Sequence, residues 1–257
     1  MFDLGLAGKR ALITGGSDGL GRATAHRMAT EGAEVVICGR RGDYLAEQAA
    51  LLSAETGKEV RAIQADVSIA DDCARLMDET AARLGGLDIL INNAGASAAA
   101  SLMEVDDDGW QADFDLKVMA AVRLCRSAVP HMRAAGGGSI VNASIGAGKT
   151  PGAKMLPTSL TRAAGLNLTK SLANEFAADN IRVNAICIGL IKSAQWDRRA
   201  GNGPVDELYD QMSKNVPLGR VGDEADFGDL AAFLCSARAT YITGTAINLD
   251  GGMCADI

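Results

Sequence analysis

The sequence is poor in aromatic residues and in positive charge, and it contains no long apolar segment. Phe, Trp and Tyr make up 4% of its 257 residues, whereas apolar residues together make up 48%, so we expect a core built from Ala, Val, Ile and Leu. Acidic residues outnumber basic ones by 32 to 25, and a nucleic-acid surface would need a basic stripe instead. No apolar run has the length of a membrane span, and residues 1–10 lack a basic-then-apolar signal pattern. We therefore expect a soluble cytoplasmic protein that binds neither nucleic acid nor membrane.

Paired cysteines and clustered metal ligands are also missing. The six cysteines are scattered, with no Cys-x-x-Cys pair, and the two histidines, His26 and His131, fall on separate predicted helices. Cysteines in this pattern are typical of small apolar core residues in a reducing compartment. We expect no metal site.

Short apolar runs flanked by glycine alternate with helix-length segments along the whole chain. Such runs indicate strands buried on both faces, and their alternation with helices predicts a parallel, doubly wound sheet. The predicted fold class is α/β, a single Rossmann-type domain of three αβα layers and seven strands that spans residues 1–257. The predicted strands are 9–14, 34–38, 59–64, 87–91, 139–143, 182–187 and 246–249. The predicted helices are 19–31, 45–52, 69–84, 110–134, 160–177 and 224–234.

A glycine-rich turn over residues 14–21 directly follows the first predicted strand and opens the first helix. Gly15, Gly19 and Gly21 let the backbone turn tightly and approach a pyrophosphate, and the helix N-terminus offers unpaired N–H groups to it. Many tight turns produce such a pattern alone. Here Asp66-Val67 after the third strand and Asn92-Asn-Ala-Gly95 after the fourth agree with it. The sequence therefore predicts a dinucleotide site.

The end of the second predicted strand decides between the two nicotinamide cofactors. An acidic residue there would accept hydrogen bonds from the adenosine ribose and repel a 2′-phosphate. This chain has Gly39-Arg40-Arg41 instead, and a guanidinium can pair with phosphate. Ordinary surface arginines are the alternative interpretation. The missing carboxylate favours NADP(H) over NAD(H).

Three motifs in the second half of the chain resemble the short-chain dehydrogenase/reductase family. They are Ser139-Ile-Val-Asn-Ala-Ser144, Arg162-Ala-Ala-Gly165 and Asn180-Ile-Arg-Val-Asn-Ala-Ile-Cys-Ile-Gly189. The resemblance extends to the run 241–252 and so covers nearly the whole chain. It implies a small-molecule substrate, a lid-like segment at about 193–216, and a homo-oligomer, most often a tetramer, paired through the helices 110–134 and 160–177.

The same resemblance, together with the glycine-rich turn, identifies the residues expected to contact the dinucleotide. They are Gly15, Ser17, Asp18, Gly19, Leu20, Gly21, Arg40, Arg41, Asp66, Val67, Asn93, Ala94, Gly95, Arg162, Gly189, Ile191 and Ser193.

The residues that the family uses for its chemistry are altered at all four positions. In the family a Tyr acts as acid or base, a Lys four residues later lowers its pKa, a Ser orients the substrate, and an Asn completes a proton relay. This frame puts Thr158 at the Tyr, Arg162 at the Lys and Lys117 at the Asn, while Ser144 lies one residue before the expected Ser. None of the three tyrosines precedes a Lys by four residues, so no realignment restores the pair.

A replacement acid is therefore needed if the chain is an oxidoreductase. An aliphatic hydroxyl such as that of Thr158 is a far weaker acid than a phenol, and it is too short to fill the same space. Lys117 is our candidate, because a partly desolvated amine beside Arg162 would have a lowered pKa. The alternative is a lysine that simply reaches solvent.

Two functions remain open from the sequence. One is an NADP(H)-dependent oxidoreductase acting on a carbonyl/alcohol pair, with Lys117 or a water held by Ser144 as the acid. The other is a non-redox or binding role on the same fold, with a nucleotide site that is structural or regulatory.

Overall fold

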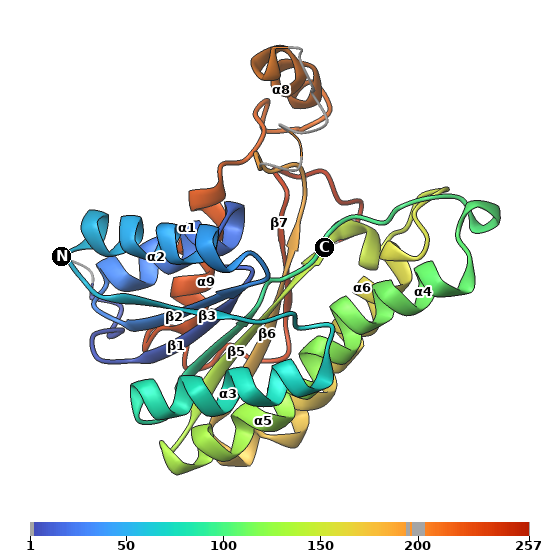
Figure 1. Cartoon of the computed structure of the whole chain (residues 1–257). Helices are drawn as coiled ribbons and strands as arrows, with labels where there is room; N and C mark the ends of the chain where they lie inside the picture. Colours follow the sequence, from blue (N-terminus) through green and yellow to red (C-terminus); the bar gives the residue numbers. More distant parts are fainter. Residues whose placement is uncertain (1–2, 194–195, 197–203, 257) are drawn as a thin grey trace.

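A computed structural model describes residues 3–193, 196 and 204–256 and contains one seven-stranded parallel sheet (Figure 1). The strand order is β3-β2-β1-β4-β5-β6-β7, with every neighbouring pair parallel. The predicted α/β class and the seven strands are confirmed. The strands are β1 (Arg10–Thr14), β2 (Glu34–Gly39), β3 (Val60–Gln64), β4 (Ile89–Asn92), β5 (Gly138–Ile145), β6 (Ile181–Ile188) and β7 (Ala246–Leu249).

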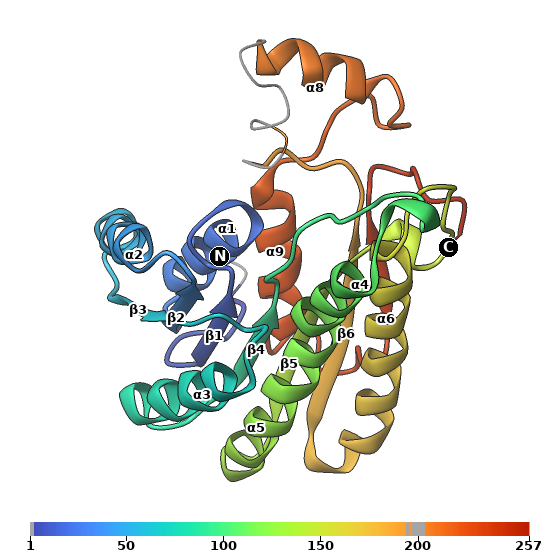
Figure 2. The same cartoon turned by 45° about the vertical axis from the view of Figure 1, so that its right-hand side comes forward.

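Helices cover both faces of the sheet (Figure 2). One face carries α1 (Gly19–Thr30), α2 (Gly42–Thr56) and α9 (Glu224–Cys235), and the other carries α3 (Ala70–Leu84), α5 (Ala120–Ala134) and α6 (Thr158–Glu175). Neighbouring strand residues alternate between the two cores: Ile13 packs with the first group and Leu12 with the second. Both faces are therefore apolar, which is why the strands read as continuous apolar runs. Within the described ranges, no helix is long and apolar enough to cross a bilayer.

The winding of the sheet reverses between β1 and β4. The chain moves outward from β1 through β2 to β3, then returns to place β4 on the other side of β1. In open α/β sheets the crevice outside the carboxyl ends of the strands at such a switch point is where ligands bind. The glycine-rich turn follows β1 at this edge of the sheet, so the predicted dinucleotide site lies at the switch point.

The long helix expected over residues 110–134 starts earlier and is interrupted. It begins as α4 (Asp107–Phe114), because the Asp106 side chain accepts a hydrogen bond from the Gly109 N–H and caps it. A π-helical turn (Asp115–Met119) then joins α4 to α5. Insertions of this kind change which side chains face inward and are frequent at functional sites.

The segment expected to form a lid contains a helix that the sequence analysis did not predict. The helix α8 (Val205–Ser213) lies beyond the carboxyl end of β6 (Figure 1). Tyr209 and Met212 of α8 form a small apolar cluster with Val221. The partly buried residues packed against this cluster are Leu190, Trp196, Val205 and Leu208. Residues 194–195 and 197–203 of the expected span lie outside the described residues. Short 3-10 turns occur at Leu102–Glu104, Gly146–Gly148 and Ala177–Asp179.

Two arginines of α3 lie along β3, at one edge of the sheet. Arg75 donates to the Gln64 carbonyl oxygen at 2.9 Å, and Arg83 donates to the Ala62 carbonyl oxygen at 3.0 Å. The guanidinium groups thus occupy backbone acceptors of β3 that no neighbouring strand uses.

Candidate active site

The glycine-rich turn forms a cradle whose wall is backbone. Gly15 and Gly19 adopt positive φ angles of 64° and 51°, which favour glycine. A side chain at Gly21 would collide with the carbonyl oxygen of Gly15, so the helix and turn can approach this closely only through glycine. Asp18 caps α1 by accepting from the Gly19 N–H at 3.0 Å. The cradle has the form that a dinucleotide pyrophosphate requires.

The Asn93–Gly95 segment joins the carboxyl ends of β1 and β4. The Thr14 hydroxyl accepts from the backbone N–H of Asn93 at 2.9 Å and of Ala94 at 3.0 Å. In return the Asn93 side-chain amide donates to the Thr14 carbonyl at 2.9 Å. These bonds fix the floor of the crevice where the sheet reverses, and the side-chain bond of Asn93 explains why Asn stands at this position.

The two arginines expected to choose the cofactor lie where predicted, exposed just beyond β2. Arg41 stacks on the Tyr44 ring at 4.2 Å and lies 3.9 Å from Asp18. Within the described ranges, the Arg40 guanidinium forms no hydrogen bond or ion pair. Beside them Asp66 caps its own turn by accepting from Ser68 at 2.7 Å, and Val67 is buried. Among the described residues, the Arg40 guanidinium thus has no protein partner, whereas that of Arg41 is stacked.

The remaining cofactor candidates lie around the same edge. Ser17 lies against Gly39 at the end of β2, and Leu20 packs against the core under the turn. Gly189 continues the pairing of β6 with β7, through its N–H and the Leu249 carbonyl. Ile191 is buried. The Ser193 backbone N–H donates to the Tyr209 hydroxyl of α8, and that hydroxyl donates to the Ser193 carbonyl oxygen. The structure therefore brings the predicted set to one edge, with Ser193 at the base of the α8 segment.

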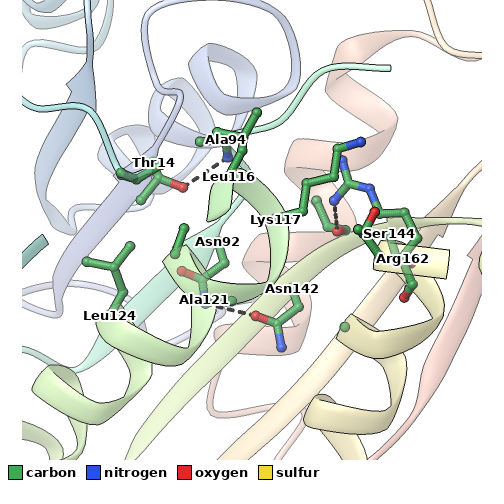
Figure 3. A pocket seen from close by; sticks show the side chains of 15 residues that line it. Thr14, Asn92, Ala94, Leu116, Lys117, Ala121, Leu124, Asn142, Ser144 and Arg162 are labelled. Carbon is green, nitrogen blue, oxygen red and sulfur yellow. Dashed lines mark hydrogen bonds between the residues drawn. The ribbon is translucent and has the colours of Figure 1, made fainter. Parts of the chain in front are cut away.

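The four candidate catalytic residues also meet. Lys117, Ser144 and Arg162 line one cavity of about 20 Å³, enough for a single water molecule (Figure 3). Thr158 lies directly beside them, because the Lys117 Nζ donates to its hydroxyl oxygen at 3.0 Å. Ser144 is buried at the end of β5, and its hydroxyl lies 3.4 Å from the Arg162 carbonyl. Four residues spread over 46 positions of the chain thus form one cluster.

Lys117 does not reach solvent, so that alternative is wrong. Its side chain is 1% exposed and ion-paired with Asp113 at 2.5 Å. Burial lowers the pKa of the Lys117 ammonium below its ordinary 10.5; the hydrogen bond to Asp113 opposes this shift, and the Arg162 charge adds to it. The expected lowering is thus present, and Asp113 limits it.

Arg162 is held against the backbone of β5 and the Asn93–Gly95 segment. Its Nη1 donates to the Ala143 carbonyl at 2.6 Å, and a side chain at Gly95 would collide with Nη2. Its buried Nε has no partner in the described part of the chain, and neither has the Oδ1 of Asn92 on the same cavity. An unpaired donor and an unpaired acceptor make this a polar cavity suited to a water or a ligand oxygen.

Sequence reasoning missed two members of the cluster, Asp113 and Thr161. Asp113 lies four residues before Lys117, and its second oxygen accepts from the Thr161 hydroxyl at 2.7 Å. The four-residue spacing on a predicted helix is a signal for an ion pair that was present in the sequence. Thr161 had no such signal, because it meets Asp113 only through packing of α6 on α4.

Comparison with known proteins gives consistent matches along the chain. Residues 15–254 match the family model described as enoyl-(acyl carrier protein) reductase. Dehydrogenase/reductase SDR family member 4 of Homo sapiens is 36% identical over 248 residues, covering 96% of this chain and 88% of that protein. The 3-oxoacyl-[acyl-carrier-protein] reductase FabG of Staphylococcus aureus is 36% identical over 247 residues, covering 95% and 98% respectively.

A solved structure matches over its full length. It is the L-sorbose reductase of Gluconobacter frateurii in complex with NADPH and L-sorbose, with a TM-score of 0.96, 37% identity, and complete coverage of both chains.

Proposed function

The chain belongs to the short-chain dehydrogenase/reductase family of oxidoreductases, and on this basis we propose that it is an NADP(H)-dependent reductase of a small carbonyl compound. The observation that carries the cofactor assignment is the glycine-rich cradle beside two arginines at the end of β2. A similar protein that binds NADPH supports it. Arg40 and Arg41 would contact the 2′-phosphate, and the cradle of residues 15–21 would hold the pyrophosphate.

The chemistry we propose differs from that of the family at each of its four positions. Thr158 and Arg162 stand in the frame of the family's Tyr and Lys, and Lys117 in that of its Asn. Support for Lys117 as the acid comes from its contact with the Thr158 hydroxyl and from its lowered pKa. Arg162 has a planar fork that suits ribose hydroxyls, and it stays charged. Ser144, on the same cavity, would hold the substrate oxygen or a water.

NADPH, held by the cradle of residues 15–21 and by Arg40 and Arg41, would supply the hydride that reduces the carbonyl carbon. The proton that completes the alcohol would originate from the Lys117 ammonium, directly or through the Thr158 hydroxyl, and Lys117 would regain one from water, so charge and atoms balance. Orientation is the main task of the protein here, and the packed edge formed by residues 93–95 and Arg162 supports a fixed nicotinamide end.

Two further features belong to the proposal. The helix α8, in the segment expected to form a lid and beyond the end of β6, would cover the bound substrate. The protein would be a homotetramer paired through α4, α5 and α6; light scattering at micromolar concentration checks this, and a monomer contradicts it.

The test is to follow NADPH oxidation by the purified protein with a panel of L-sorbose, other ketoses, a 3-oxoacyl thioester and simple ketones. We expect little turnover of simple ketones and measurable turnover of a polar member of the panel. Lys117→Met should lower that rate by roughly 10²–10⁴-fold with little change in NADPH affinity. The matched control is Lys58→Met, which removes an exposed lysine that is distant from Lys117 in the sequence.

Efficient reduction by Lys117→Met would refute the role of that residue. Turnover of a substrate without any nucleotide would refute the reductase assignment and favour a non-redox function on this fold.

A further inference from the structure

Three short contacts link one buried carboxylate, one buried ammonium and two hydroxyls. Asp113 on α4 holds the Lys117 ammonium at 2.5 Å through one oxygen and accepts the Thr161 hydroxyl at 2.7 Å through the other. The Lys117 Nζ in turn donates to the Thr158 hydroxyl oxygen at 3.0 Å. The side chains of Asp113 and Lys117 are 3% and 1% exposed, so solvent does not screen this chain of contacts.

The backbone explains why Lys117 points inward. It lies in the middle of the π-helical turn between α4 and α5, and it is the buried residue of that turn. Asp113, in the last turn of α4, is the buried residue of that helix. The last turn of α4 and the π-helical turn thus each bring one charged side chain to the start of α6, where Asp113 meets Thr161 and Lys117 meets Thr158.

The Thr158 hydroxyl accepts two hydrogen bonds, so its proton can point only away from both donors. Its oxygen accepts from the Lys117 ammonium at 3.0 Å and from the Ala98 backbone N–H at 2.9 Å. A hydroxyl has two acceptor sites and one proton, so both acceptor sites are filled. Its proton therefore has no acceptor among the described residues, and the adjacent ammonium supplies the acidity that an aliphatic hydroxyl lacks.

The charges around Lys117 come from two helices. Asp113 on α4 favours the ammonium, and Arg162 on α6 opposes it. Arg123 on α5 is paired with Asp115 and with the Ser68 carbonyl. Asp113 is thus the group that offsets both burial and the repulsion from Arg162.

We infer that Asp113 is a positioning residue of this site, which holds Lys117 as an ammonium against the Thr158 hydroxyl so that a proton can leave toward the substrate oxygen. The inference rests on the proposed reductase function. With NADPH bound, the cofactor would supply the hydride to the carbonyl carbon, the Thr158 hydroxyl would give its proton to the carbonyl oxygen, and Thr158 would take one from Lys117. Solvent then reprotonates Lys117, whose place beside Asp113 is unchanged.

The experiment measures the titration of Lys117 directly, by nuclear magnetic resonance of the full chain labelled at lysine, with and without NADPH. Lys117→Met assigns the signal. Without Asp113 the ammonium loses its partner and still faces Arg162, so we expect Asp113→Asn to lower the midpoint by about 1–3 pH units. Asp113→Glu should restore part of the difference. Asp108→Asn, an exposed carboxylate of the same helix, should leave the midpoint unchanged.

The same change should be visible in catalysis. Reduction needs the ammonium, so the fall in kcat/KM at high pH should begin at lower pH in Asp113→Asn. If Asp113→Asn does not fold, Thr161→Val keeps both charges but removes a donor that competes with Lys117 for the carboxylate, so it should move the midpoint in the opposite direction, upward, and by a smaller amount.

The possible outcomes separate the two claims. If Lys117→Met is inactive while the Asp113 and Thr161 variants titrate like the wild type, the inference about Asp113 is wrong and the proposed function stands. If the midpoint falls as expected but Lys117→Met reduces carbonyls normally, the proposed role of Lys117 is wrong and the inference falls with it.

Discussion

Replacing Asp113 should destabilise the protein more than replacing Lys117, although the two residues form one ion pair. The relevant variants are Asp113→Leu, Lys117→Met and the double variant, which exchange the charges for apolar groups. Breaking a buried pair on one side costs about 3–5 kcal/mol, because the other charge stays buried without a partner. Both side chains are almost fully buried, so values in this range apply to each single change.

The asymmetry comes from the surroundings of each charge. In Lys117→Met, Asp113 keeps the Thr161 hydroxyl at 2.7 Å and the positive charge of Arg162 nearby. In Asp113→Leu, Lys117 loses its anionic partner and keeps the repulsion from Arg162. The double variant removes one charge of each sign, so its loss should be smaller than the sum of the single losses by about 0.5–3 kcal/mol.

Alkaline pH should relieve the loss in Asp113→Leu and not in Lys117→Met. Burial already holds the pKa of Lys117 below 10.5 in the folded protein, and removal of Asp113 lowers it further. Between that lowered value and 10.5 the unfolded chain binds the extra proton, so stability rises with pH across this window. Urea unfolding at fixed protein concentration, at neutral and alkaline pH, measures these differences. Additive single losses, or equal losses without pH dependence, would refute the reasoning.

Three further predictions follow from the site and the fold. Thr158→Val should lower the rate of carbonyl reduction by an amount similar to Lys117→Met while Thr158→Ser retains most of it, as steady-state kinetics will show; equal rates would exclude the hydroxyl. Arg40→Ala should weaken NADPH binding by roughly tenfold to a hundredfold and leave NADH binding unchanged, with a smaller effect for Arg41→Ala, whose guanidinium is already stacked on Tyr44; nucleotide titration measures both. Asp88→Asn should lose about 1.5–3 kcal/mol at neutral pH in urea unfolding, because Asp88 accepts from the Arg10 side chain at 2.7 Å. Burial raises the pKa of Asp88, but the bonds from Arg10 outweigh it and hold the pKa below 3.8, so the wild-type advantage should vanish as pH falls through that lowered value.

The strands could be predicted from the sequence to within about two residues, because each is an apolar run that ends at glycine or a polar turn. The predicted strand 246–249, for example, is β7 as observed. The glycine-rich turn was equally readable, since only glycine permits the contact between Gly21 and the Gly15 carbonyl. These features depend on local sequence, and local sequence was sufficient for them.

The cluster around Lys117 depended on packing that the sequence does not encode locally. A continuous helix over 110–134 would also place Asp113 and Lys117 on one face, but only the folded structure shows that this face is buried and that Lys117 meets Thr158 there. The α8 helix was missed because its polar residues read as a loop, and its apolar face of Tyr209 and Met212 meets Val221 only after the chain has folded. In both cases tertiary contacts decided the outcome.

The arginines along β3 bear on how copies of this chain behave at high concentration. An edge strand with free carbonyl groups is a template on which another extended segment can add, and growth by that route leads to aggregates. Arg75 and Arg83 already occupy the carbonyls of Gln64 and Ala62, and they bring positive charge to the same edge. A second chain would have to displace both guanidinium groups, which are also held by Glu79, before its own N–H groups could pair. The two arginines therefore oppose the addition of another strand at the β3 edge, although no further strand among the described residues protects it.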